Sequence, residues 1–405
     1  MCGLNRSQWA WCLYDWANSA FALACMTALL PPLLVRAVDR ELGAPAGTVV
    51  WGWLAMAGMA LSLAFSPPLG AWMDAHAKRR WVLAASVAVG ALSCLFVGLA
   101  LERAWPLAGA AYVLGASAFA LGNVAYDALL PGVAPGGDVD RVSAVGYSLG
   151  YLGGAVALVL ALVLWRWGST SAAFGVVGLW WGVFAVPVLA WVPEPPAGKR
   201  HTVTLLANAW RKLRANPRAV RFLLAYWLYN DGIGTVIKMA GAYGGELGLP
   251  LIHVVGALLL AQVVGVPATL AFGWGAPRLG CKRLILLALV VYLGVALWGV
   301  RLSRPWEFWA LAAAVGTVQG GAQALSRSLF ARFVPEGSEA AFFSFFDVSG
   351  RFAGLAGPAL FAAAVQVSGS PRAGVLVTAV FFLAGGLLLV GVKESGGASS
   401  AAENP

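Results

Sequence analysis

Twelve apolar stretches, each long enough to cross a bilayer, are the feature that most restricts what this chain can fold into. A helix spans the hydrocarbon core with about 20 predominantly apolar residues. The chain is 60% hydrophobic and 11% charged, whereas soluble domains carry about 25% charged residues. We therefore expect an all-α integral membrane protein, with spans near residues 9–35, 49–72, 81–101, 105–131, 142–165, 171–192, 219–243, 252–276, 284–301, 305–330, 340–366 and 373–392.

Lysine and arginine are distributed unevenly between these stretches. Of the 27 such residues, 18 fall in the loops of one side and 7 in those of the other, while Lys238 and Arg351 fall within spans. Because positive charge is retained on the cytoplasmic side, this bias predicts that both termini are cytoplasmic, and we expect a bacterial inner membrane. Membrane topology also accounts for the net charge of +10, so we expect no nucleic-acid partner.

The first stretch needs a separate check, because Arg6 precedes it as a positive charge precedes the apolar core of a signal peptide. The stretch runs from about Trp9 to Val35 and carries Asp15. It is too long for a signal-peptide core, and no clean small-residue cleavage site follows it. We therefore expect this stretch to be retained as the first membrane helix.

The polar segment 193–218 separates two halves that resemble each other. Features that recur at an offset of 200 are two helical glycines, Gly150 and Gly154 (as Gly350 and Gly354), the amide Asn123 (as Gln323) and Pro135 (as Pro335). Parallel six-span repeats are typical of transporters whose substrate site lies between the halves. We predict an N-terminal half at 1–192, a cytoplasmic linker at 193–218, a C-terminal half at 219–393 and a disordered tail at 394–405.

Residues 70–80, which read GAWMDAHAKRR, resemble the loop motif G-x-x-x-D-x-x-G-R-[RK] of the major facilitator superfamily. The chain departs from that motif at Ala77, where the superfamily has glycine. Narrower stretches resemble the vacuolar-effluxer-like, "unidentified major facilitator" family: YDWANSAF at 14–21, RVSAVGYSLGYLGG at 141–154, YWLYNDGIGTVI at 226–237, QALSRSLFAR at 323–332 and FFDVSG at 345–350. The resemblance implies a 6+6 helix fold with alternating access, and its fungal members are linked to amino-acid efflux from the vacuole.

Carboxylates within the first span of each half are the leading candidates for function. An ionisable residue at the bilayer centre costs roughly 2.5 to 3.5 kcal/mol on insertion scales, so each needs a reason. We hypothesise that they bind a substrate amine or a proton; helix–helix hydrogen bonds, or gating at Asp15, are the alternatives. These acids and their polar neighbours are Asp15 with Tyr14 and Asn18, and Asp231 with Tyr229 and Asn230.

Three further charges lie within the spans. Lys238 follows Asp231 by two helical turns and shares its face, so the two could bind a zwitterion; a structural ion pair or a lysine reaching the membrane surface is equally compatible. Asp347 and Arg351 stand at i and i+4 with the acid first, which favours a local salt bridge. A switchable pair with the other half is the alternative.

The resemblance also implies a gate at the cytoplasmic mouth. The superfamily's motif aspartate, which corresponds to Asp74, caps a helix of the other half and holds one transport state. Positive-inside topology is the simpler explanation for the basic residues, and we favour it for Arg80. Asp127 and Arg327 carry opposite charges at the offset of 200, which is either a lock between halves or a coincidence. The gating candidates are Gly70, Asp74, Arg79, Arg80, Asp127 and Arg327.

Glycines at 146, 150 and 154 recur every four residues and line one helical face. Small residues at this spacing allow two membrane helices to approach closely. We expect this stripe to be structural and to contact helices of the other half.

Other classes of protein fit less well. The three histidines and five cysteines show no metal-ligand spacing, and no Walker or G-x-S-x-G motif is present, so we expect no enzyme, metal or cofactor. We predict a monomeric secondary active transporter in the lipid bilayer, with protons as the coupling ion because ionisable acids occur without an obvious sodium cage. By resemblance the cargo is an amino acid or similar polar metabolite; a multidrug or other small-molecule exporter is the alternative.

Overall fold

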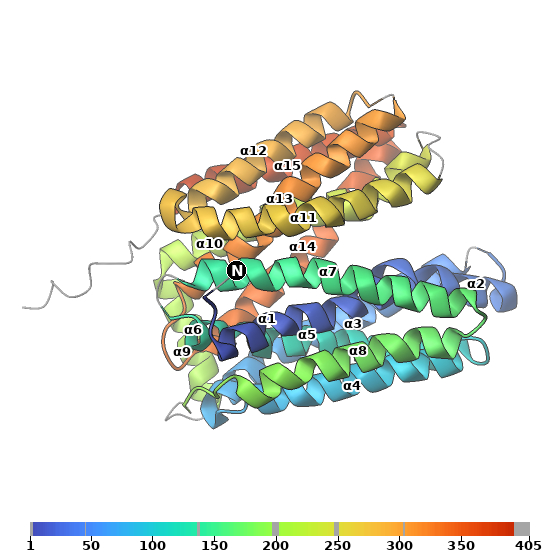
Figure 1. Cartoon of the computed structure of the whole chain (residues 1–405). Coiled ribbons are helices and arrows are strands. Elements are labelled where there is room, and N and C mark those ends of the chain that lie inside the picture. Colours follow the sequence, from blue (N-terminus) through green and yellow to red (C-terminus); the bar gives the residue numbers. More distant parts are fainter. Residues whose placement is uncertain are drawn as a thin grey trace, which may run out of the picture. The chain divides into compact units, whose positions relative to one another are not determined.

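The computed structural model describes residues 3–44, 46–135, 138–196, 202–246, 251–302 and 304–392. These residues form helices and short connections, without a strand among them, so the all-α prediction is confirmed. The elements, labelled in Figure 1, are α1 (Arg6–Phe21), η1 (Ala22–Ala28), α2 (Leu30–Leu42), α3 (Ala46–His76), α4 (Arg79–Ala100), α5 (Trp105–Asp127), α6 (Leu130–Val133), α7 (Val139–Arg166), α8 (Thr170–Trp191), α9 (Thr202–Ala215), α10 (Pro217–Glu246), α11 (Leu251–Leu279), α12 (Cys281–Gly299), α13 (Pro305–Ala331), α14 (Glu339–Ser368) and α15 (Pro371–Val390).

Each of the twelve predicted spans coincides with a long helix or, for the first, with the run from α1 through η1 to α2. Ten spans in the described residues are long and apolar enough to cross a membrane. The other two long helices, α10 and α13, are of similar length but carry more polar side chains, among them Asp231 in α10 and Gln319 and Gln323 in α13. Polar residues in these two helices matter for the candidate site.

The first span changes its winding halfway along. Seven residues, Ala22–Ala28, form a π-helix, and Pro31 and Pro32 follow in the first turn of α2. Proline lacks the N–H that would continue the hydrogen-bond ladder, so the regular helix is interrupted here. Cys25 lies in the π-helical turn, with its sulfur 3.9 Å from that of Cys94 in α4. Both thiols are free and buried, as expected for cysteines that act as small apolar residues.

Close backbone contacts divide the chain into two compact units. Unit 1 contains residues 1–133, 149–209 and 335–347, and unit 2 contains residues 134–148, 210–334 and 348–405. Besides α9, which is divided after Ala209, two membrane helices contribute to both units: the first ten residues of α7 belong to unit 2, and the first nine of α14 belong to unit 1. These two helix starts make the polar contacts on which the candidate site is built.

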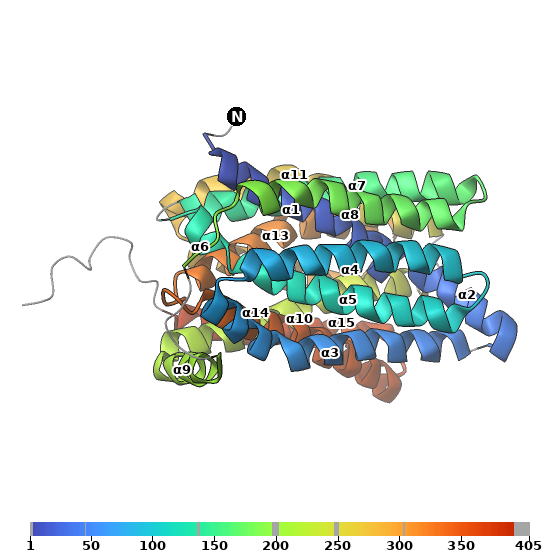
Figure 2. The ribbon, with the colours of Figure 1, turned by 90° about the horizontal axis from the view of Figure 1, so that it is seen from below.

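Each unit has the same internal pairing of helices. In unit 1, α4 packs on α5 and α8, α1 packs on α8, and α3 packs on α5. In unit 2, α12 packs on α13 and α15, α10 packs on α15, and α11 packs on α13. Figures 1 and 2 both show α4 and α8 side by side along their lengths in unit 1. A repeated sequence predicts this repeated pairing; the boundaries proposed for the two halves stay predictions.

The predicted linker contains a helix of its own. In α9, Leu205, Ala209 and Leu213 recur every four residues and are buried, whereas Val203 and Trp210 are exposed. This spacing places the buried residues on one helical face. Residues 197–201 of the linker lie outside the described part of the chain. So do residues 393–405, which include the whole predicted tail.

Candidate functional site

One face of α3 docks on the start of α14, within unit 1; we call this contact the first junction. Ser66, Gly70 and Asp74 stand four residues apart and are all buried. The Ser66 hydroxyl donates to an Asp347 carboxylate oxygen across 3.1 Å. At Gly70 a Cβ atom would lie 2.6 Å from the carbonyl oxygen of Ala340. Glycine is therefore required at 70, because the two helix backbones meet there.

Asp74 caps the N-terminus of α14. Its two carboxylate oxygens accept from the backbone N–H groups of Ala340 and Ala341, at 3.0 and 2.9 Å. These N–H groups belong to the first turn of α14 and have no partner within the helix. A carboxylate at this position also interacts favourably with the helix dipole. The geometry is the one that the resemblance implied for Asp74.

Arg79 completes the first junction. Its guanidinium is fully buried and lies 2.6 Å from an Asp74 oxygen and 2.7 Å from an oxygen of Glu339, the first residue of α14. A buried cation remains in place only when it is paired and hydrogen-bonded. The predicted gating residues Asp74 and Arg79 thus share one cluster with Glu339, which sequence reasoning did not single out. Its position in the first turn of a predicted helix was the available signal.

Glu194 is a second carboxylate that the sequence analysis missed. It follows α8 and accepts from the backbone N–H groups of Arg79 and Arg80 at 2.9 and 2.7 Å, so it caps α4. The Arg80 guanidinium donates to the carbonyl of Leu189 in α8. Arg80 therefore ties α4 to α8, while Arg79 ties α4 to α14. The two neighbouring arginines have different tasks in the fold.

The start of α7 docks on α11 and α13 within unit 2; we call this contact the second junction. Gly273 of α11 stands 203 residues after Gly70, and a Cβ atom there would lie 2.4 Å from the Cβ of Ala144 in α7. The Ser148 hydroxyl of α7 donates to the carbonyl of Val266, 3.2 Å away. Pro277 occupies the position that matches Asp74 at the same offset, so the helix cap of the first junction has no counterpart.

Asp140 and Arg332 supply the charges of the second junction instead. Asp140, in the first turn of α7, accepts from the Ser328 hydroxyl at 2.7 Å and from the Arg332 guanidinium at 2.6 Å. The Asp140 side chain is 2% exposed and that of Arg332 31%. The sequence analysis did not identify this pair, since both residues lie outside the matched positions of the repeat.

Arg327, a predicted gating residue, also belongs to the second junction. Its guanidinium donates to the hydroxyl and carbonyl of Ser143 at 3.0 and 3.1 Å and lies 4.4 Å from the centre of the Tyr147 ring. Both partners are on α7. Asp127, which matches Arg327 at the offset of 200, is the half-buried last residue of α5 in unit 1. Its part in a lock stays a prediction.

On α1, the predicted residues differ in their surroundings. Asn18 is buried and donates to the side-chain oxygen of Asn123 in α5 across 2.8 Å. Tyr14 is fully buried, with its ring 4.6 Å from that of Tyr126. These two residues therefore tie α1 to α5. Asp15 is half-buried and faces α7, where a Cβ on Gly150 would lie 3.5 Å from the Asp15 Cβ.

The glycine stripe of α7 packs against α1. Cβ atoms added at Gly150 and Gly154 would lie 2.8 Å from the hydroxyl oxygen and 3.1 Å from the carbonyl oxygen of Ser19. The expectation that the stripe contacts the other half was therefore wrong for these two glycines. Small residues show that a helix has a close neighbour, and the tertiary fold selects which neighbour this is.

Asp231 is the most deeply buried of the acids predicted to bind substrate or protons. It is fully buried in α10 and accepts from the backbone N–H of Gly357 in α14 at 2.8 Å. Pro358 follows directly and interrupts the hydrogen-bond ladder of α14. The Asp231 carboxylate therefore binds α14 beside the proline that removes one of its backbone hydrogen bonds.

Around Asp231, the neighbouring polar residues also join helices. The Tyr229 hydroxyl lies 2.6 Å from that of Ser326 in α13, and the Asn230 amide donates weakly, over 3.5 Å, to the carbonyl of Gly350 in α14. Arg351 is half-buried on α14. The side chain of Lys238 lies outside the described residues, so its predicted pairing with Asp231 stays a prediction.

Comparison with known families supports one assignment. A family model described as "Vacuole effluxer Atg22 like" matches residues 55–402. A relative from Bacillus subtilis, "Uncharacterized MFS-type transporter YxiO", is 32% identical over 96% of this chain and 95% of its own length. Autophagy-related protein 22 of Chaetomium globosum is 31% identical over 57% of this chain. The match spans 42% of that fungal protein.

Solved structures resemble this chain in fold. The human organic anion transporter MFSD10 matches with a TM-score of 0.76 at 17% identity, covering 96% of this chain and 100% of its own. A bacterial homologue of the iron transporter ferroportin matches with a TM-score of 0.74 at 16% identity, covering 95% and 98%. The proton:xylose symporter XylE matches with a TM-score of 0.73 at 10% identity, covering 97% and 95%. The chain has the major facilitator fold and belongs to the Atg22-like vacuole effluxer family of membrane transporters.

Proposed function

We propose that this protein is a monomeric secondary active transporter that couples the movement of a small polar metabolite to that of protons, with amino acids as the leading cargo. It resides in a bacterial inner membrane with both termini in the cytoplasm. The observation that carries the proposal is the Asp231 carboxylate. It is fully buried in a membrane helix and accepts the backbone N–H of Gly357 in α14, next to Pro358. An acid at such a site is costly and is usually retained for ion or substrate handling.

Proton coupling follows from the chemistry of this contact. An ionised Asp231 accepts the Gly357 N–H strongly, because hydrogen bonds to charged groups are stronger than those between neutral groups. Protonation weakens the acceptor and lowers the cost of moving the group within the membrane. A proton can therefore change how firmly α10 holds α14. Asp15, half-buried on α1, is the corresponding acid of the first half.

Alternating access is supported by the two junctions. The first joins residues 66–79 to residues 339–347, and the second joins residues 140–148 to residues 266–332. Each junction therefore ties a segment of one predicted half to a segment of the other by hydrogen bonds and ion pairs. Contacts of this kind form in one conformation and break in the other, so they act as gates. We therefore propose that Asp74 and Arg79 form part of a gate at the cytoplasmic mouth.

Amino acids lead as cargo for two reasons. The chain belongs to a family described as vacuole effluxers, and a zwitterion requires both an anionic and a cationic partner. Asp231 supplies the first and Lys238, two turns further along α10, is our candidate for the second. A hydrophobic drug would need neither an embedded lysine nor two embedded carboxylates.

The test uses purified full-length protein in proteoliposomes that contain a pH-sensitive dye. A panel of amino acids, dipeptides and cationic drugs is added with and without a pH gradient. We expect at least one amino acid to move together with protons. Asp15→Asn and Asp231→Asn should each abolish the coupling, whereas Asp39→Asn should retain it, because Asp39 caps a helix outside this region by accepting from the Gly47 N–H.

Two results would contradict the proposal. Proton-coupled transport that persists in both membrane-acid variants excludes Asp15 and Asp231 as coupling residues. Ligand-dependent stabilisation of the purified protein by drugs, with flat melting curves for every amino acid, excludes the leading cargo and favours an exporter. If transport requires sodium at constant pH, then sodium and not the proton is the coupling ion.

A further inference from the structure

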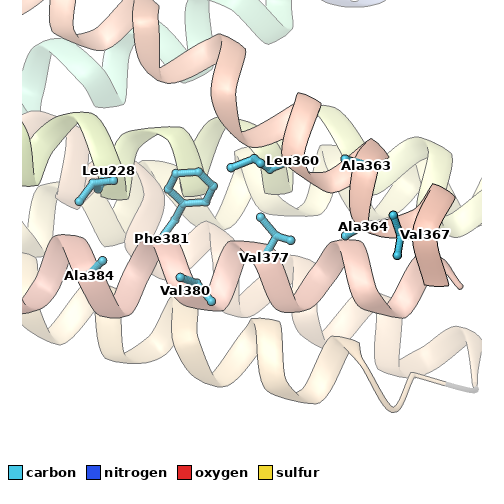
Figure 3. A pocket seen from close by; sticks show the side chains of 9 residues that line it. All are labelled: Leu228, Leu360, Ala363, Ala364, Val367, Val377, Val380, Phe381 and Ala384. Atoms are coloured by element: carbon cyan, nitrogen blue, oxygen red, sulfur yellow. The ribbon is translucent and has the colours of Figure 1, made fainter.

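An apolar groove lies on unit 2 between α10, α14 and α15, and none of the residues assigned to transport lines it. It has a volume of about 540 Å³ and is lined by aliphatic and aromatic side chains: Leu228, Leu360, Ala363, Ala364, Val367, Val377, Val380, Phe381 and Ala384. Figure 3 shows Leu228 and Ala384 toward one end of the groove and Val367 toward the other.

The sequence explains why this space is left open. Pro358 removes one backbone N–H from α14 just before the groove, and the Gly357 N–H beside it donates to Asp231 of α10. Beyond Pro358, α14 presents the small side chains Ala363 and Ala364, and α15 presents Ala384. Close-packed interiors fill such a gap with larger side chains. Alanines at these positions keep a channel between the helices.

The medium around this surface limits what can fill it. All three helices belong to the membrane-spanning part of the chain, and Val367, Val380 and Leu360 are more than half exposed. No polar side chain lines the groove, so a polar metabolite would lose its hydrogen bonds on entering it. A hydrocarbon chain would lose none.

The groove has the dimensions of part of an acyl chain. It covers eight residues of α14, from Leu360 to Val367, and eight of α15, from Val377 to Ala384. Seven steps of 1.5 Å make both lengths about 10 Å. An apolar groove of this length between two helices accepts part of an extended hydrocarbon chain.

A positive charge stands at one end. Val367 lies just before the turn between α14 and α15, and Arg372, the second residue of α15, is exposed five residues before Val377. The guanidinium therefore belongs to the same end of the groove, about 7 Å along the α15 axis from its first lining residue. The N-terminus of α15 also carries the positive end of the helix dipole. Arginine and a helix N-terminus together favour a phosphate.

We propose that this groove binds one phospholipid with an anionic headgroup, its acyl chain lying between α14 and α15 and its phosphate beside Arg372. The bound acyl chain fills the groove and packs against residues 360–367 of α14, beyond Pro358. The lipid is a ligand of the transporter in addition to its cargo. Its binding can be measured without any transport assay, so its failure would leave the proposed function untouched.

The test is photo-crosslinking of the full-length protein in nanodiscs. The probe is phosphatidylglycerol with a diazirine in its acyl chain, and labelled peptides are identified by mass spectrometry. We expect labelling of residues 360–367 and 377–384 that saturates with probe and is competed by unlabelled phosphatidylglycerol. Ala364→Phe fills the groove and should abolish the saturable labelling. Ala362→Phe, on the same helix but outside the groove, should leave it unchanged.

The variant Arg372→Gln separates the contribution of the lipid headgroup to binding from that of the acyl chain. A basic residue near the membrane surface contributes about 1 kcal/mol to binding an anionic lipid, so competition by phosphatidylglycerol should weaken roughly fivefold. Competition by phosphatidylcholine, which carries the same phosphate but no net charge, should weaken less. Equal loss for both lipids would overturn the preference for an anionic headgroup, and no loss for phosphatidylglycerol would overturn the assignment of the phosphate to Arg372.

Two outcomes would overturn the groove itself: labelling that does not saturate, and labelling that survives Ala364→Phe. If Ala364→Phe does not fold, Ala384→Leu fills the other end of the groove by a smaller change and serves the same purpose.

Discussion

The two junctions have the same backbone arrangement and different electrostatics. In both, a glycine at equivalent repeat positions, Gly70 or Gly273, allows one helix to pack directly on the start of another. In the first junction a buried carboxylate caps the incoming helix and binds a fully buried arginine. In the second, proline stands in place of that carboxylate, and an acid on the incoming helix itself, Asp140, pairs with a partly exposed arginine. Close approach is conserved within the repeat, while the charges that hold it are not.

The turns that follow α3 and α11, beside the two junctions, also differ between the halves. Ala77 has φ of 50°, and it is the one non-glycine residue with positive φ in the described part of the chain. Gly280, at the matching position of the second half, has φ of 87°. The first turn therefore holds alanine in a conformation that suits glycine. The departure from the superfamily motif noted in the sequence is thus a point of backbone strain.

Removing the helix cap of the first junction should have the largest effect. Asp74→Ala leaves Arg79 buried with Glu339 alone and removes the acceptor from two N–H groups of α14. Breaking a buried pair typically costs about 3 to 5 kcal/mol, so the melting temperature of the purified protein should fall steeply. Asp39→Ala, which removes a cap outside both junctions, is the control. A loss no greater than in that control would show that the cap contributes nothing special.

Adding a methyl group should distinguish the two glycines. Gly70→Ala places a Cβ 2.6 Å from a backbone oxygen, and Gly273→Ala places one 2.4 Å from the Ala144 side chain. Overpacking of this kind costs about 1 to 3 kcal/mol. Ala144→Gly should restore most of the stability lost in Gly273→Ala, because it removes the atom in conflict. No side-chain change can do so for Gly70→Ala. Failure of the double variant to recover in thermal unfolding would contradict the distinction.

The ion pair of the second junction should contribute less. Arg332→Gln removes a partner that is 31% exposed, and pairs near the surface contribute about 1 kcal/mol or less. The stability difference from the unmodified protein should shrink further in high salt, since exposed charges are screened. Arg79→Gln should cost several times more and depend little on salt. Equal salt dependence for the two variants would mean that the difference in burial between Arg79 and Arg332 does not change how much their ion pairs stabilise the protein.

The turn substitutions should have the smallest effect and opposite signs. Ala77→Gly relieves a left-handed alanine and should stabilise the protein by about 0.5 to 1 kcal/mol. Gly280→Ala should destabilise it by about 1 kcal/mol. Chemical unfolding of each variant measures both values. Destabilisation by Ala77→Gly would show that chain entropy outweighs strain at this turn.

Much of the fold followed from local rules. Long apolar runs require membrane helices, because backbone groups in lipid must be satisfied within the segment. The offset between the halves could be seen in single residues such as Gly150 and Gly350. Asp74 was identified through a motif whose chemistry is local, an acid and a cluster of bases at a turn.

The cluster around Asp74 could be predicted only in part. Glu194 and Glu339 are ordinary acids at the ends of helices in the sequence, and nothing local shows that both converge on Arg79 and its backbone. The same holds for Asp140, whose partner Arg332 lies nearly two hundred residues away. Long-range pairing depends on which helices become neighbours, and periodicity does not contain that information.

The sequence by itself therefore determined that this chain is a membrane transporter of twelve helices, with acids embedded in the first helix of each half. The tertiary structure decided that α14 and α7 begin against helices of the opposite predicted half. It also decided that Gly150 and Gly154 of α7 pack against α1 and that Asp231 accepts a hydrogen bond from Gly357 of α14. The physical reason is that hydropathy acts residue by residue along the chain. Ion pairs, caps and close glycine contacts instead act over a few ångströms, between segments that only the folded chain brings together.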